Sequence, residues 1–260
     1  MNAFSRLVLG LVLAGSACAA PTDPGAPEPT GRLELIGVLD PGLSEQLISV
    51  RWIDDRARGP VTAELAEWHG DRFVTVATVT ASDCARGAFR FGQCLRIPAA
   101  VRAGELYEVR VSAPGTQTAT AVTRVPADFE IAAVSSDRLN EGGLRFSATW
   151  TASQHAYRYL TSVRQRRTDP CYWDECFQSE NWVDLVAGLG AETRLDAAQS
   201  RDVGFGLDLR VAAVPEALVR YLQSGSGGRY PALPTTNVTG GFGLVSSWNA
   251  RVAALTGPAN

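Results

Sequence analysis

The residues Gln46-Leu-Ile-Ser-Val-Arg-Trp-Ile53 form one of the clearest strand patterns in this 260-residue chain. In an extended segment, Ile48, Val50 and Trp52 point to one side and the other four residues of the run from Leu47 point to the opposite side. This alternation predicts a half-buried β-strand with the first set facing the core. The run Leu106-Tyr-Glu-Val-Arg-Val-Ser112 alternates in the same way.

Short apolar runs with turn residues between them continue through the first half of the chain, up to residue 126. His69-Gly70-Asp71 joins two of these runs and is typical of a β-hairpin turn. The expected strands are 32–39, 46–53, 61–68, 72–80, 88–97, 106–112 and 116–125. About seven strands at a spacing of 8–12 residues are typical of an immunoglobulin-like sandwich. We therefore expect one such domain over residues 31–126.

The strand pattern restarts after Pro126 and predicts a second β-sandwich over residues 127–256. Its expected strands are 129–134, 144–150, 156–163 and 207–214. Trp150 followed by a Tyr-rich strand resembles the core pair of fibronectin type III domains. A short helix is expected at 215–224, because Pro215 suits a first turn, Leu218, Val219 and Leu222 form an apolar face, and Gly225 ends it. The fold class is thus all-β, with two tandem β-sandwiches.

The first thirty residues carry the pattern of an export signal. A basic residue precedes the apolar run 7–14, and small residues follow it up to Cys18. This end resembles the lipobox of bacterial lipoproteins, in which the Cys is acylated and becomes the first mature residue. Residues 1–18 are then the signal peptide and 19–30 a Pro-rich tether. Ordinary secretion, with cleavage after Ala19, is the alternative. Ala19 after the Cys resembles outer-membrane sorting.

Four cysteines remain if Cys18 carries lipid, and they form two close pairs in the sequence, Cys84 with Cys94 and Cys171 with Cys176. An even number in an exported chain implies disulfides. Three pairings are possible, and we expect the local one. A cysteine metal site is the alternative, but the chain lacks the Cys-x-x-Cys spacing and a neighbouring His that zinc sites use.

The composition excludes several classes of function. The net charge of −3 gives no electrostatic footprint for nucleic acid. All 24 basic residues are Arg, which excludes catalytic lysines and the P-loop lysine. The two histidines, His69 and His155, have no partner at ligand spacing, and there is no Gly-x-Ser-x-Gly nucleophile motif. We expect no cofactor, no metal and no enzymatic activity.

The segment 164–184 is the best candidate for a binding surface. It reads as an irregular insertion, stapled by Cys171 and Cys176, in which aromatic residues lie among charged ones. The candidate ligand-binding residues are Tyr172, Trp173, Phe177 and Trp182. Stapled loops with aromatic side chains on a β-scaffold are common recognition surfaces. The alternative is that these side chains cover the core of the second domain.

The C-terminal segment Asn237-Val-Thr-Gly240-Gly241-Phe-Gly243 resembles the signature of a family of uncharacterised outer-membrane lipoproteins. Members are often encoded near TonB-dependent receptors, and have a lipobox and an immunoglobulin-like first half. The resemblance implies location and architecture, with no catalytic residues. From the residues themselves we expect the glycines to be structural, because a strand-like run, and no helix, follows them.

Together these patterns predict a lipid-anchored protein of the cell envelope, held in the outer membrane by palmitate or a similar acyl chain at Cys18. We expect a non-catalytic binding or accessory module. Its possible partner is an outer-membrane TonB-dependent receptor or another envelope protein. A structural or adhesion module is the first alternative. A secreted hydrolase is the second, and would need a His within reach of a Ser or carboxylate in a pocket.

Overall fold

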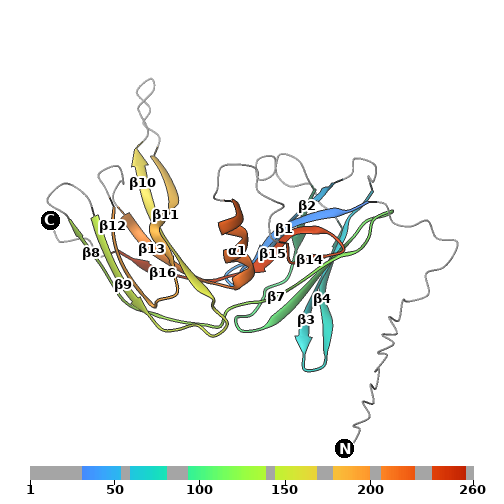
Figure 1. Cartoon of the computed structure of the whole chain (residues 1–260), viewed down its shortest axis with the longest axis horizontal. Helices are drawn as coiled ribbons and strands as arrows, with labels where there is room; N and C mark the ends of the chain where they lie inside the picture. The colour runs from blue at the N-terminus through green and yellow to red at the C-terminus, as the bar shows by residue number, and fades with distance from the viewer. Residues whose placement is uncertain are drawn as a thin grey trace, which may run out of the picture.

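Two β-sandwiches form the two lobes of the molecule, and one short helix, α1, lies between them (Figure 1). The computed structural model describes residues 31–53, 59–80, 93–138, 144–168, 178–199, 206–225 and 236–255. The elements are strands apart from α1 (Glu216–Gly225). The expected all-β class, with a helix near the C-terminus, is confirmed.

The first sandwich consists of a four-stranded sheet of order β15-β1-β2-β5 and a five-stranded sheet of order β14-β7-β6-β3-β4. Its strands are β1 (Leu33–Leu39), β2 (Gln46–Trp52), β3 (Thr62–His69), β4 (Arg72–Thr80), β5 (Gln93–Ile97), β6 (Leu106–Ser112), β7 (Ala119–Arg124), β14 (Val238–Thr239) and β15 (Phe242–Ser247). Two of the nine therefore come from the far end of the chain.

The second sandwich pairs a four-stranded sheet of order β11-β10-β13-β16 with a three-stranded sheet of order β12-β9-β8. Its strands are β8 (Ile131–Arg138), β9 (Leu144–Trp150), β10 (Arg158–Thr168), β11 (Gln178–Gly190), β12 (Arg194–Gln199), β13 (Gly206–Val214) and β16 (Asn249–Ala254).

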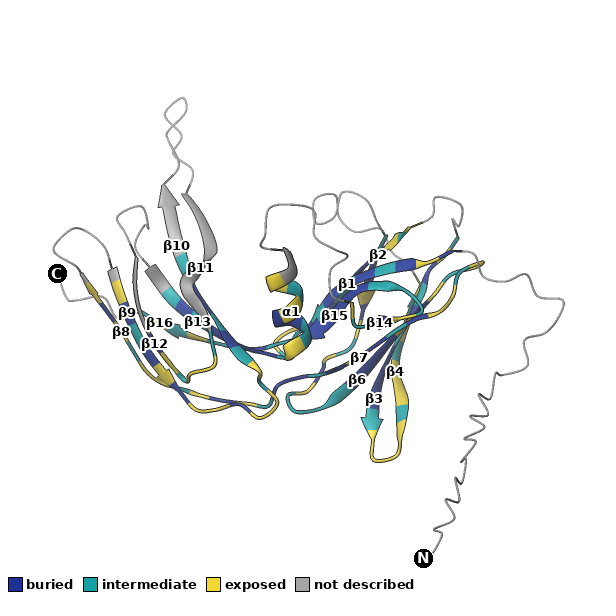
Figure 2. Ribbon diagram, viewed as in Figure 1, coloured by how far each residue is buried: buried dark blue, intermediate teal, exposed yellow. Residues whose placement is uncertain are grey.

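The alternation in the sequence explains the core of the first sandwich. Every second residue of β1 is buried, and Ile48 and Val50 of β2 are fully buried, as expected. They meet Leu65, Val109 and other residues of the facing sheet in one apolar cluster. Figure 2 shows these buried residues running along the inner faces of both sheets.

A buried tyrosine fixes a corner in each sandwich. The hydroxyl of Tyr107 accepts a hydrogen bond from the backbone N–H of Arg102 at 2.8 Å, which is the tyrosine corner seen in immunoglobulin-like domains. Tyr159 accepts a similar bond from the N–H of Ser153 at 2.7 Å. Its ring lies 5.4 Å from that of Trp150 in an edge-to-face contact. The expected Trp–Tyr core pair of the second sandwich is therefore present.

Helix α1 packs between the two lobes. Leu218 and Val219 are buried in a small cluster with Ala212 and Val214 of β13 and with Leu244 of β15. Leu222 was expected on the same apolar face, but it is 42% exposed. The buried stripe is narrower than expected because the helix contacts its neighbours along only one side.

The C-terminal residues 237–254 form strands that pair with both lobes, and we call these residues the strap. β15 runs parallel to β1 in six consecutive register pairs, β14 pairs with β7, and β16 pairs with β13 of the second sandwich. The expected second domain of 127–256 is thus corrected, because β14 and β15 belong to the first sandwich.

The expectation of an irregular insertion over 164–184 also needs correction. Residues up to Thr168 continue β10, and residues from Gln178 onward form β11. The two strands are antiparallel, with Thr168 opposite Gln178. The sequence did not show this because polar and charged residues occupy 164–169 without any apolar alternation.

Candidate functional site

The strands β10 and β11 extend beyond their sheet as a two-stranded arm. Among the described residues, the pairing of β13 with β10 ends at Gln165, opposite Gly206, the first described residue of β13. β10 and β11 continue to pair with each other through Arg166–Glu180 and Arg167–Ser179 to Thr168–Gln178. Figure 1 shows the hairpin rising above the rest of its lobe. We define the arm as residues 166–180.

The arm carries most of the binding residues expected from the sequence. Tyr172, Trp173 and Phe177 belong to its nine-residue connection, as do Cys171 and Cys176, and all of them lie outside the described residues. Trp182 lies on β11, in register with Arg164 of β10. The proposed binding segment thus coincides with the end of the projecting hairpin.

At the foot of the arm, charged side chains on the outer face of the sheet hold β10 and β13 in place. Arg164 forms an ion pair with Asp208 on β13. The Nε of Arg210 donates a hydrogen bond of 2.9 Å to the Oγ of Ser162, which is fully buried. The guanidinium of Arg210 also lies 5.2 Å from the ring centre of Trp248. Such cation–π contacts add stability at partly buried positions. The arm therefore starts from a rigid base.

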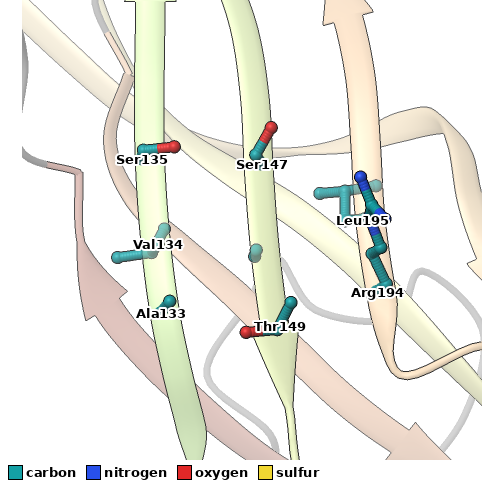
Figure 3. A pocket seen from close by; sticks show the side chains of 8 residues that line it. Ala133, Val134, Ser135, Ser147, Thr149, Arg194 and Leu195 are labelled. Atoms are coloured by element: carbon teal, nitrogen blue, oxygen red, sulfur yellow. The ribbon is translucent and has the colours of Figure 1, made fainter.

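A second candidate site is a concave feature on the outer face of the three-stranded sheet, where β8, β9 and β12 meet (Figure 3). It is an open groove with a volume of about 250 Å³. It is hollowed because small side chains occupy its floor, and Arg194 lies at one side. Its lining consists of Ala133, Val134, Ser135, Ser147, Ala148, Thr149, Arg194 and Leu195.

The groove can offer hydrogen bonds but no catalytic group. Within the part of the chain that the structure describes, the hydroxyls of Ser135, Ser147 and Thr149 and the guanidinium of Arg194 have no protein partner. Hydroxyl groups and a guanidinium suit a polar or anionic ligand. Sequence reasoning missed this groove, although the small polar residues that alternate along β9 were a usable signal.

Among the described residues, no group of three His, Cys, Asp or Glu side chains is placed to hold a metal ion. His69 and His155 are both exposed and lie apart, His69 at the end of β3 and His155 in a turn. His155 has a backbone φ of 66°, a left-handed conformation that is uncommon outside glycine. The position of His155 in a turn accounts for this conformation.

The residues expected to carry lipid or disulfides are only partly described. Cys94 is buried in β5, whereas Cys18 and Cys84 lie outside the described residues. Across the described ranges, no helix combines the length and the apolar character needed to cross a membrane.

Comparison with known proteins found no match: no family model matches the chain, and no curated protein is significantly similar to it.

Proposed function

We propose that this protein is a lipid-anchored component of the cell envelope that binds a partner without catalysing a reaction. The lipobox-like segment ending at Cys18 supports the anchor, and the resemblance of the C-terminal segment to outer-membrane lipoproteins supports the location. In this proposal a TonB-dependent receptor or another outer-membrane protein is the partner, and acyl chains at Cys18 hold the protein at the membrane. Stable anchoring of this kind needs more than one acyl chain.

The projecting arm is the observation that carries the binding role. In the described part of the arm, β10 and β11 pair with each other alone, and an isolated two-stranded hairpin is only marginally stable. We infer that the aromatic connection at its end serves recognition. A disulfide between Cys171 and Cys176 would hold the end of the hairpin closed. Tyr172 and Trp173 would then present large apolar surfaces at little cost in conformational entropy.

The arm is tested by placing a photo-cross-linking amino acid at position 173 of the full-length protein in living cells. The matched control carries it at His69, an exposed residue at the end of β3 in the first sandwich. We expect a discrete adduct from position 173 and none from position 69. Equal adducts at both positions, or none at 173, would contradict the arm as the contact element.

The anchor is tested separately by labelling cells with palmitate. The wild type should incorporate label and fractionate with the outer membrane, and Cys18→Ser should do neither. If neither protein incorporates label and both are released, the protein is secreted by the ordinary route. If Cys18→Ser is still labelled, Cys18 is not the acylated residue.

A structural or adhesion role is the second candidate, and the edge strand β4 favours it. β4 is nine residues long, and it ends its sheet in the described part of the molecule. Val74 and Val76 on it are 38% and 44% exposed. Long edge strands with exposed apolar residues can pair with other chains. If Val76→Lys abolishes a self-association seen by light scattering, this role gains support. A protein that is monomeric at all concentrations would exclude pairing of β4 with a second copy.

A further inference from the structure

We propose that the open side of the first sandwich is a binding slot for an extended segment, and that the strap is the segment it binds. Without the strap the first sandwich does not fold, so the two lobes form one folding unit. The inference goes beyond the proposed envelope role and does not depend on it.

The strap closes the same side of both sheets of the first sandwich. β14 forms the edge of one sheet beside β7, and β15 forms the edge of the other beside β1. Val238 and Val245 of the strap are buried in the main core cluster with Leu33 and Leu35 of β1. Removing the strap would therefore expose this side of the core and leave the edge of β1 unpaired.

The Asn237 side chain sets the turn between β14 and β15. Its amide nitrogen donates a hydrogen bond of 2.6 Å to the carbonyl oxygen of Val245. Its amide oxygen accepts one of 3.0 Å from the backbone N–H of Val245. These two bonds let one side chain replace a backbone pair, and they hold the strap in the shape that fits the slot.

The slot accepts glycine and no larger residue at three positions, Gly240, Gly241 and Gly243. Gly243 has a φ of 98°, and a Cβ there would lie 2.0 Å from the carbonyl oxygen of Leu35. Gly240 has a φ of 74°, and its Cβ would lie 2.2 Å from the carbonyl oxygen of Thr118. Both contacts are with backbone atoms of the first sandwich, so they cannot be relieved by a side-chain rotation. The Asn-x-x-Gly-Gly-x-Gly pattern is thus a close fit to the slot, which confirms the structural role expected of these glycines.

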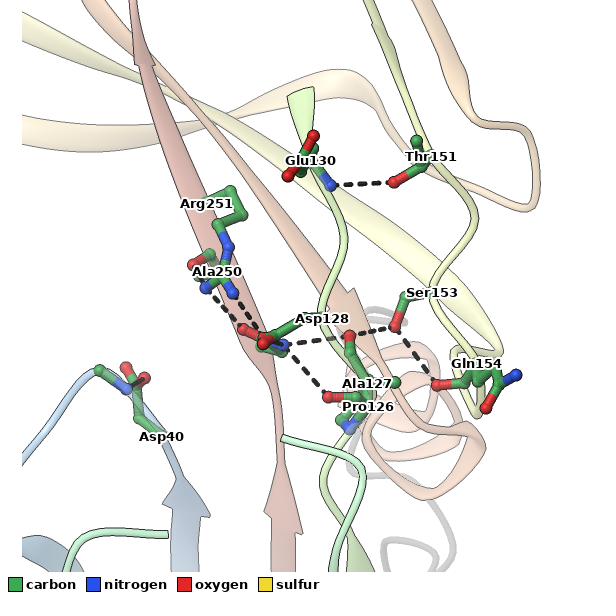
Figure 4. A network of polar contacts seen from close by, with 12 residues as sticks. Asp40, Pro126, Ala127, Asp128, Glu130, Thr151, Ser153, Gln154, Ala250 and Arg251 are labelled. Atoms are coloured by element: carbon green, nitrogen blue, oxygen red, sulfur yellow. Dashed lines mark hydrogen bonds and ion pairs between the residues drawn. The ribbon is translucent and has the colours of Figure 1, made fainter. Parts of the chain in front are cut away.

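The strap then crosses to the second lobe through a buried polar junction. The Oγ of Ser247 donates a hydrogen bond of 2.7 Å to the carbonyl oxygen of Arg124. The Asn249 amide, which is fully buried, donates to the carbonyl oxygens of Pro126 and Ala127 and to Asp128. Arg251 forms an ion pair with Asp128 (Figure 4).

This junction lies beside the direct connection from β7 to β8. The chain passes between the lobes three times: directly after β7, through α1 between β13 and β14, and in the strap. The first and the last of these crossings meet at this junction. Two crossings at one place, bonded to each other, restrict rotation of one lobe against the other. A single linker of the same length would allow it.

The test uses the full chain with a protease site inserted after Gly228, in the connection between α1 and the strap. After cleavage of the folded protein, the strap fragment should co-elute with the remainder in gel filtration. The cleaved protein is then denatured, and the two fragments are separated and refolded. Hydrogen exchange at β1 should show no protection in the large fragment alone. It should show native protection when a synthetic peptide of residues 233–257 is added.

A peptide of the same length that carries Gly243→Ala is the matched control, and it should restore at most one tenth of the protection. Native protection of β1 in the large fragment alone would overturn the proposal. Failure of the wild-type peptide to restore protection, or equal rescue by the control peptide, would overturn it as well.

Discussion

Single residues decide whether the strap fits, and Gly243 and Gly115 separate steric overlap from backbone strain. Both have a positive φ, 98° and 73°, but a Cβ at Gly115 would meet nothing within 4 Å. Gly115→Ala should therefore lower the free energy of unfolding by about 1–2 kcal/mol, which is the cost of holding alanine in the left-handed conformation. Gly243→Ala should cost about 1–3 kcal/mol more, because it also overlaps Leu35. Urea unfolding of both variants measures this difference, and equal losses would contradict the close fit.

Tyr107 makes the free energy of unfolding change with pH in the alkaline range. Its side chain is fully buried, and burial raises the pKa of its hydroxyl above the usual 10.0 because the phenolate is disfavoured there. A raised pKa in the folded state means that the folded protein holds the proton more tightly. This stabilisation is fully present below pH 10 and is lost as the pH rises through the raised pKa.

Tyr107→Phe should remove this pH dependence together with the corner hydrogen bond to Arg102. At pH 8 we expect a loss of about 1 kcal/mol, and above pH 10 a shallower decline than in the wild type. Tyr157→Phe, at a side chain that is 47% exposed, is the control and should change neither. The free energy of unfolding, measured between pH 8 and pH 11, decides the matter. A decline as steep as that of the wild type would show that another group titrates.

Among the elements, helix α1 contributes to stability through the side chains on one side of its surface. Leu218 is 6% exposed and touches both lobes through its cluster, whereas Leu222 is 42% exposed one turn later. Leu218→Ala should cost about 2–5 kcal/mol, as is usual for a buried leucine. Leu222→Ala should change the stability by less than about 0.5 kcal/mol. Thermal unfolding of the pair tests this, and similar losses would mean that α1 does not fasten the lobes.

The arm should depend on its staple without affecting the core. We expect the double variant Cys171→Ser with Cys176→Ser to be cut by trypsin at Arg166 or Arg167 much faster than the wild type. The rest of the molecule should unfold at an unchanged urea midpoint, because the arm lies beyond the pairing with β13. Peptide mapping without reduction identifies the disulfide directly. If Cys171 is found joined to Cys84 or Cys94, the local pairing is wrong.

The sequence predicted an element well where the apolar pattern of that element lies within its own residues. β2 and β6 alternate because each has one face in the core, and Pro215 and the apolar spacing marked α1 to within one residue at each end. β10 and β11 were missed beyond Val163 because the residues that follow show no apolar alternation. The groove was missed because the alternation of Ser147 and Thr149 is visible in β9, whereas the strands β8 and β12 that complete the groove beside it are not named by the sequence.

At the scale of the whole molecule, the strap was beyond prediction from pattern alone. The sequence predicts a strand-like run over 244–248, but nothing in these residues identifies β1, some 200 residues earlier, as the parallel partner. Parallel pairing has no turn to set its register, so only the completed fold determines it. The glycines that permit the pairing were visible in the sequence, and their neighbours were not.

The strap gives the arm a fixed position in the molecule. In the proposed envelope role, the tether would precede the first sandwich and the arm belongs to the second. A partner at the arm would then be held at a set orientation only if the lobes move together. A loose pair of sandwiches would unfold in two steps. Lobes joined by the strap should unfold in a single step.

Native-state hydrogen exchange of the full-length protein tests this central claim most directly. The amides of β1 in the first sandwich and of β13 in the second should exchange through a common global opening. Their free energies and their dependence on denaturant should then agree. A β13 that opens with a free energy lower than that of β1 by more than about 1.4 kcal/mol, a factor of ten in population, would show that the lobes unfold separately.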